Sequence, residues 1–136
     1  MRTITLRIGE VRATAALDGE ADLGAAFWSA LPIETELLSA NWSGHACTFP
    51  APPALLAASG RIEPGGNDVP VGRLAVASAD HGGIVLVAYG TTMHHTALGP
   101  APVAALATLG EGRDAFLARI ERLFDEGAAR LTIERA

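Results

Sequence analysis

Residues 3 to 15 read TITLRIGEVRATA, and apolar side chains alternate with polar ones on both sides of a single glycine. Positions 4, 6 and 8 are large and apolar, and positions 11, 13 and 15 continue the pattern after Gly9-Glu10. Alternation of this kind is typical of a β-strand that buries one face. Glycine supplies the positive φ that a tight turn needs, so the stretch predicts an antiparallel hairpin.

Two segments change to helical spacing. From Asp22 to Leu31 bulky apolar residues recur at every fourth position, Asp22 is placed to cap the first amides, and Pro32 follows as a stop signal. From Arg113 to Glu126 a second stripe recurs at helical spacing, and Gly127 follows as a terminator. The members of this second stripe are Phe116, Leu117, Ile120, Leu123 and Phe124. We therefore expect one helix early in the chain and one late.

The remaining apolar stretches predict strands. Residues 34–49 are extended but interrupted at Ser43-Gly44, and a glycine inside a strand pattern often marks a bulge. Residues 84–89 read IVLVAY and are apolar on both faces, so this strand is expected to be central and buried. Further strands are expected at residues 74–79, 103–109 and 131–133, although 103–109 also fits a helix. Residues 50–70 are rich in proline and glycine and predict a long loop, whose role the sequence leaves open.

The composition fits one domain over residues 1–136. Hydrophobic residues make up 49% of the chain and charged residues 18%, which excludes a disordered chain. The formal net charge of −5 argues against nucleic acid as a partner. Strands outnumber helices and hairpins are common, so the pattern predicts a mainly β fold. The pattern fits either an antiparallel barrel or a sandwich of about seven strands, with the helices covering its open ends.

No segment is expected to enter a membrane or to direct export. The longest uncharged stretch, residues 40–60, contains His45 and three prolines, and is too polar for a bilayer span. The first residues alternate and lack the apolar centre of a signal peptide. The sequence therefore predicts a cytoplasmic protein without a membrane partner.

Several short motifs occur in an order that is familiar. They are Trp42-Ser43-Gly44 after the first helix, Gly72-Arg73-Leu74 at the start of a strand, and Ala88-Tyr89-Gly90 at the end of another. In this order the chain resembles a bacterial family of small cyclophilin-like proteins of unknown function, over nearly its whole length. The resemblance implies a closed, cyclophilin-like β-barrel of about eight strands capped by two helices.

The resemblance does not extend to the site of the true prolyl isomerases. Those enzymes line one groove with an Arg, a Phe, a Gln, a Trp and a His. The stretch that carries their Arg, Phe and Gln has no counterpart here, and the chain contains no glutamine. Prolyl isomerase activity is therefore disfavoured.

The four histidines raise the question of a metal site. His94 and His95 are adjacent, so in an extended segment their rings point to opposite sides and do not easily bind one ion. His45 or His81 would have to converge with one of them, and no carboxylate is spaced to complete a set. We predict no metal and no cofactor.

Cys47 and His45 raise the question of a nucleophilic thiol. Residues two apart on a strand share a face, so a histidine there can lower the pKa of a thiol. No third, orienting group is visible in the sequence. The preferred interpretation is a small buried thiol beside a half-buried histidine.

The best candidate site is a pocket on the barrel rim, formed at the ends of neighbouring strands. Its expected ligand-binding residues are Trp42, Ser43, His45, Tyr89, Thr91 and His94. The two aromatic rings would stack on a small organic ligand, and His45 or His94 would exchange a proton near neutral pH. The competing interpretation is that Trp42 and Tyr89 belong to the core, since aromatic residues are only 5% of the chain.

These residues support two functions of different kinds. The preferred function is the binding of a small polar metabolite or a peptide segment at the barrel rim. The alternative is an enzyme that acts on a small amide, ureide or cyclic imide by proton transfer through His45 or His94, an idea that rests on analogy at the level of the fold. A homodimer also fits the sequence, because two strands are expected to end unpaired at the surface.

Overall fold

The centre of the molecule is a closed barrel of antiparallel strands. The structure is a computed structural model, and it describes residues 2–63 and 65–136. The barrel strands are β1 (Thr3–Ile8), β2 (Val11–Ala16), β3 (Ile33–Ser39), β4 (Gly44–Pro50), β5 (Arg73–Ala77), β6 (Ile84–Thr92), β9 (Ala104–Leu109) and β10 (Ala128–Arg135). Around the ring they follow the order β1-β10-β3-β4-β6-β5-β9-β2. The prediction of a mainly β, closed barrel of eight strands is confirmed, and the sandwich is excluded.

The N-terminal hairpin forms as predicted and turns its apolar face inward. β1 and β2 pair along their full length across Gly9, whose φ is 59°. Ile4 and Leu6 are fully buried in the barrel interior. The far edge of β1 pairs with β10. Strand β10 also pairs with β3, so the C-terminal strand completes the ring.

Strand β6 is buried on both faces, as the run of apolar residues predicts. Val85 and Val87 point into the barrel interior, where they join the main core. Leu86 and Ala88 lie on the outer face and join a second, smaller core. Val69 belongs to this second core, so part of the predicted loop covers the outside of the barrel. Val69 therefore has a structural role in this covering.

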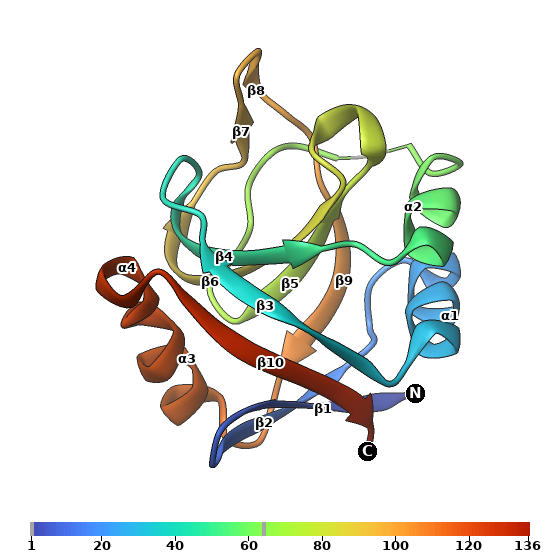
Figure 1. Ribbon diagram of the computed structural model, residues 1–136. Helices are drawn as coiled ribbons and strands as arrows, with labels where there is room; N and C mark the ends of the chain where they lie inside the picture. The colour runs from blue at the N-terminus through green and yellow to red at the C-terminus, as the bar shows by residue number, and fades with distance from the viewer. Residues whose placement is uncertain (1, 64) are drawn as a thin grey trace.

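Helices close the core from two sides of the barrel. Figure 1 shows α1 (Ala21–Ala30) and α2 (Pro53–Ser59) side by side on one side, and α3 (Arg113–Glu121) with α4 (Leu123–Glu126) on the other. Phe27 of α1 and Phe116 of α3 are fully buried in the same main core. The ring of Phe27 lies 6.4 Å from that of Phe49 in β4, centroid to centroid. The expected capping of the barrel is therefore found.

Helix α2 lies within residues 50–70, which the sequence analysis predicted as loop. Proline is tolerated in the first turn of a helix, because the amide it lacks has no partner there. Pro53 occupies that first turn, and Leu55 and Ala58 behind it are buried against the core. The prediction of a loop is therefore wrong over residues 53–59, because Pro53 begins a helix there.

The late helix is also less regular than predicted. It breaks at Arg122 into α3 and the single turn of α4. Phe124, expected in the apolar stripe, is 59% exposed as a result. At the early helix, Glu20 rather than Asp22 is the N-cap residue, and its side chain makes no capping hydrogen bond.

A two-stranded ribbon stands outside the barrel, formed by β7 (His95–Thr96) and β8 (Gly99–Pro100), and projects at the top of Figure 1. In the barrel itself every strand has a neighbour on both sides. The unpaired edges that suggested a homodimer are therefore not found in the barrel, and the homodimer stays a prediction. Among the described residues, no helix has the length and hydropathy to cross a membrane.

Candidate functional site

Four of the six predicted site residues lie at two separate hollows, Trp42 and His94 at one and His45 and Tyr89 at the other. The first, called the Trp42 hollow, has a volume of about 470 Å³ and is lined by Trp42, Gly82, Ile84, His94, His95, Thr96 and Ala97. The second, called the Tyr89 hollow, has a volume of about 260 Å³ and is lined by His45, Tyr89, Glu121, Phe124 and Asp125. The two sets share no residue. The structure thus divides the expected rim pocket, and the binding of a ligand by these residues stays a prediction.

Strand geometry explains this division. Side chains alternate along a strand, so Tyr89 shares the inward parity of Val85 and Val87 and packs at the edge of the main core. Trp42 lies in the turn that joins β3 to β4, outside the barrel wall. The bulge between Gly44 and Ala46 shifts the register of β4 just after this turn. Neighbouring strand ends therefore present their aromatic rings to different hollows.

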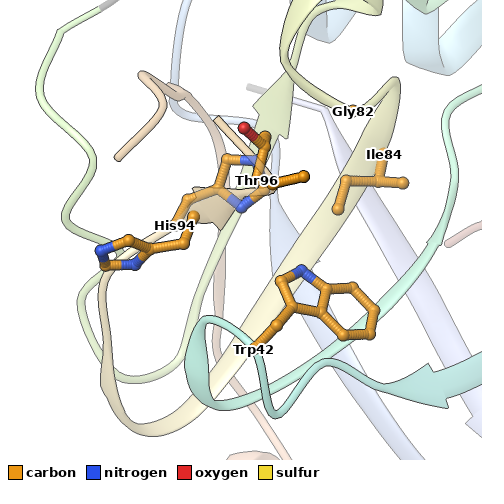
Figure 2. Close-up of a pocket in the computed structure, with 7 residues that line it drawn as sticks. Trp42, Gly82, Ile84, His94 and Thr96 are labelled. Carbon is orange, nitrogen blue, oxygen red and sulfur yellow. The ribbon is translucent and has the colours of Figure 1, made fainter. Parts of the chain in front are cut away.

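Trp42 does not belong to the core. Its side chain is 51% exposed, which contradicts the competing interpretation of a buried tryptophan. Figure 2 shows the indole of Trp42 and the side chain of Ile84 on one side of the hollow, with His94 and Thr96 across from them. A large aromatic face in water beside a hollow is a typical feature of a ligand site.

His94 is buried and fully hydrogen-bonded. Its Nε2 lies 2.8 Å from the carbonyl oxygen of His81, so Nε2 carries the proton and donates it. Its Nδ1 lies 3.1 Å from Oγ of Ser43 and accepts the hydroxyl proton. Oγ of Ser43 accepts in turn from the backbone N–H of His95, at 3.0 Å. This chain of bonds joins the β3–β4 turn, the 79–83 loop and the end of β6.

His95, which the sequence analysis did not select, has the more available ring. Its Nδ1 lies 2.8 Å from the carbonyl oxygen of Met93 and therefore donates to it. In the neutral imidazole, Nε2 is then the unprotonated nitrogen and accepts a hydrogen bond or a proton. Alternation along a strand separates the environments of adjacent histidines, but the sequence does not say which of the two is buried.

The two remaining predicted residues, Ser43 and Thr91, line neither hollow. Ser43 is buried and acts through its bonds to His94 and His95. Thr91 is exposed and lines neither of the two hollows. Gly82, Ile84, Thr96 and Ala97 were missed because they come from a loop, a strand start and a ribbon that only the tertiary fold brings together.

The Tyr89 hollow has an aromatic wall and an acidic rim. The rings of His45 and Tyr89 stack with their centroids 5.7 Å apart and their planes 22° from parallel. Glu121 and Asp125 come from α3 and α4. Partial burial raises the pKa of Tyr89, and the negative charges around it, including those of Glu121 and Asp125, raise it further.

Cys47 is a core residue, as the preferred interpretation predicts, but His45 is exposed and not half-buried. It is fully buried, and its Sγ lies 3.3 Å from the carbonyl oxygen of Ile120. Burial raises the pKa of the thiol to about 12. His45, the expected activator, stacks on Tyr89 instead. The thiolate required of a nucleophile is therefore disfavoured.

The histidines do not converge on one point. Within residues 2–63 and 65–136, no three side chains of the metal-ligating types lie close enough together to hold an ion.

Comparison with known proteins gives similarity in structure alone. No protein-family model matches the chain, and no curated protein matches it in sequence. The structure of McbB in complex with tryptophan is similar, with a TM-score of 0.73 and 18% identity over 97% of this chain. The chain spans 44% of McbB, less than half of its length.

A second similar structure matches from end to end. The solution structure of the hypothetical protein AF2241 from Archaeoglobus fulgidus has a TM-score of 0.57 and 15% identity, over 99% of this chain and 95% of its own. At these identities the two likenesses show the fold alone. Together with the closed ring of eight strands, they fit a cyclophilin-like barrel fold.

Proposed function

We propose that the protein binds a small molecule with a flat ring in the Trp42 hollow. The observation that carries this proposal is the half-exposed indole of Trp42 at the edge of a hollow of about 470 Å³. A hollow of this size falls in the range of small-molecule sites. Stacking a ring on the indole removes apolar surface of both partners from water, which favours binding.

The polar groups of the hollow favour a ligand that donates hydrogen bonds. In the neutral imidazole of His95, Nε2 is the nitrogen that accepts a hydrogen bond, and Thr96 is the next residue in the chain and also lines the hollow. An N–H or O–H group on the ring of the ligand satisfies the histidine nitrogen. A planar imide, a ureide or an indole combines such a donor with a flat face.

The hollow is held in shape by the buried bonds behind it. Ser43 and His94 fix the turn that carries Trp42 relative to the segment that carries His95. A site that is rigid before binding loses less entropy when the ligand arrives. This preorganisation supports a binding role over a purely structural one.

Two likenesses agree with the proposal. McbB, which is similar in fold, has been solved in complex with tryptophan, a molecule with an indole ring. The motifs around Trp42 and Tyr89 also resemble those of small bacterial cyclophilin-like proteins, and we assign the chain to that group as part of the same proposal. A peptide segment that presents an aromatic side chain fits the same hollow.

The free nitrogen of His95 favours a second candidate function. An imidazole with an unprotonated Nε2 at a ligand hollow has the state required of a general base. The reaction would be the hydrolysis of a small amide, ureide or cyclic imide. His95 takes the place of His94 in this candidate, because both ring nitrogens of His94 already have partners.

Ligand titration of matched tryptophan variants tests the proposal. The probes are tryptophan, hydantoin, uracil and a cyclic dipeptide, and calorimetry gives the dissociation constant. At least one probe is expected to bind, and Trp42→Ala is expected to weaken it about tenfold or more. Trp28→Phe is the control, because the guanidinium groups of Arg2 and Arg135 lie over the Trp28 ring, and Trp28 lines neither hollow.

Two results would contradict the proposal. One is equal affinity of Trp42→Ala and the unmodified protein for every probe that binds. The other is the absence of binding by the whole panel at millimolar concentration. Turnover of hydantoin or the cyclic dipeptide that disappears in His95→Ala would establish the enzymatic candidate.

A further inference from the structure

The Tyr89 hollow has a lining that differs in chemistry from the Trp42 hollow. Three of its side chains are aromatic rings and two are carboxylates: His45, Tyr89, Phe124, Glu121 and Asp125. They come from β4, β6 and the two short helices α3 and α4. The fold therefore brings together three segments of the chain, around residues 45, 89 and 121–125, that are far apart in sequence.

The aromatic wall is built by close packing. A Cβ atom at Gly90 would lie 2.7 Å from Cβ of His45, so only glycine lets His45 approach the strand beside Tyr89. The two rings then stack at 5.7 Å. Phe124 stands at the hollow with 59% of its side chain exposed. Exposed aromatic faces attract cations through the negative charge of the ring face.

The two carboxylates are left without the basic groups nearest to them in sequence. Arg119 and Arg122 both bind Glu126, at 3.0 and 2.8 Å. Among the described residues, the ion pairs of the molecule do not include Glu121 or Asp125. The hollow thus gathers two negative charges beside three aromatic rings, in a chain whose net charge is −5.

We propose that the Tyr89 hollow binds a guanidinium group, carried by a small molecule or by an arginine side chain of a peptide. A guanidinium is planar, so it stacks on an aromatic face and still directs its N–H groups to carboxylates at the edge. An ammonium is strongly hydrated and lacks a flat face, so it fits the same lining less well. The site is independent of the ligand proposed for Trp42, because the two hollows share no lining residue.

The behaviour of Tyr89 agrees with a negative potential in the hollow. Desolvation raises the pKa of its phenol most, and the charges of Cys47, Glu121 and Asp125 add to the rise. The carboxylate charges of Glu121 and Asp125, which oppose a phenolate, also favour a bound cation, whereas Cys47, with its raised pKa, stays a neutral thiol near pH 7.

Nuclear magnetic resonance titration of Tyr89 tests this proposal. Tyr89 is the one tyrosine of the chain, so its ring signals report the hollow without ambiguity. The probes are butylguanidine, as a free guanidinium compound, and N-acetyl-arginine amide, as the peptide form, with butylamine as the ammonium comparison of equal charge. Both guanidinium probes are expected to shift the Tyr89 signals, and the tighter one identifies the source of the group.

The decisive variant is Glu121→Gln/Asp125→Asn, compared with Glu10→Gln/Glu111→Gln. The second pair of glutamates is exposed, lies outside the hollow and changes the net charge by the same amount. We expect about tenfold weaker guanidinium binding in the first variant and unchanged binding in the second. Equal weakening in both would show attraction by net charge alone and overturn the proposal. So would butylamine binding as tightly as butylguanidine, or no shift of Tyr89 with any probe.

Discussion

His94 and His95 are adjacent in sequence but differ in every physical respect that bears on function. His94 is buried, and both of its ring nitrogens have partners inside the protein. His95 is partly exposed, and one carbonyl oxygen fixes its tautomer. The first residue therefore holds the hollow in shape, and the second faces whatever enters it. Trp42 completes the division of roles with the exposed surface on which a ring can stack.

Ser43→Ala is expected to lower the free energy of unfolding by about 1–3 kcal/mol, because it leaves one buried group and one partly buried group without partners. These groups are Nδ1 of His94 and the backbone N–H of His95. Urea denaturation measures the change. His95→Ala is the control and is expected to cost less than about 0.5 kcal/mol, since its ring makes one exposed bond. Equal costs for the two variants would contradict the structural role of Ser43.

The buried thiol of Cys47 gives the stability a pH dependence at high pH. Its pKa rises from 9.0 to about 12 on folding, so above pH 9 the unfolded chain loses a proton that the folded chain keeps. The free energy of unfolding is therefore full below pH 9 and falls as pH rises toward 12, by at most about 1.4 kcal/mol per pH unit. Denaturation series above and below pH 9 measure this slope. Cys47→Ala should show a smaller slope than the unmodified protein, and an identical slope would mean that the thiol is not buried.

At the scale of the element, the β3–β4 turn determines where the site lies. Gly44 has a φ of 119°, and a Cβ atom there would lie 2.5 Å from the carbonyl oxygen of Thr91. The turn, the bulge that follows it and the position of Trp42 all depend on this close approach. A side chain at position 44 would push β4 away from β6.

Gly44→Ala is expected to destabilise the protein by about 2 kcal/mol or more, through a disfavoured φ and a clash with backbone. Gly66→Ala is the matched control, because a Cβ atom there meets nothing within 4 Å. Thermal denaturation of both variants gives the difference. A control as unstable as Gly44→Ala would show that the effect is not specific to the bulge.

The elements also show which features are predictable from sequence. The hairpin at Gly9 and the two-faced strand β6 follow from local alternation and hydropathy, and both were predicted. Helix α2 and the break of the late helix at Arg122 were not predicted. Tertiary packing decides whether a proline begins a helix, and it also decides where a helix with an apolar stripe ends. Glu121 and Phe124 were assigned to the helix and not to a site, since nothing local connects them to β4 and β6.

At the scale of the whole molecule, closure of the barrel explains why one predicted pocket became two. In a closed ring, inward-facing side chains at strand ends meet the covering helices, and side chains of the turns meet the outer loops. Tyr89 belongs to the first group and Trp42 to the second. The sequence contains the right aromatic residues, but their separation depends on the wall of the barrel between them.

The most direct test of the account is the position of a bound ring in solution. Intermolecular nuclear Overhauser effects, recorded with the tightest binder among tryptophan, hydantoin, uracil and the cyclic dipeptide, report which protein protons lie near the ligand. The account predicts contacts to the indole of Trp42 and to His95 and Thr96, with none to the ring of Tyr89. Contacts to Tyr89 and His45 in place of Trp42 would contradict it.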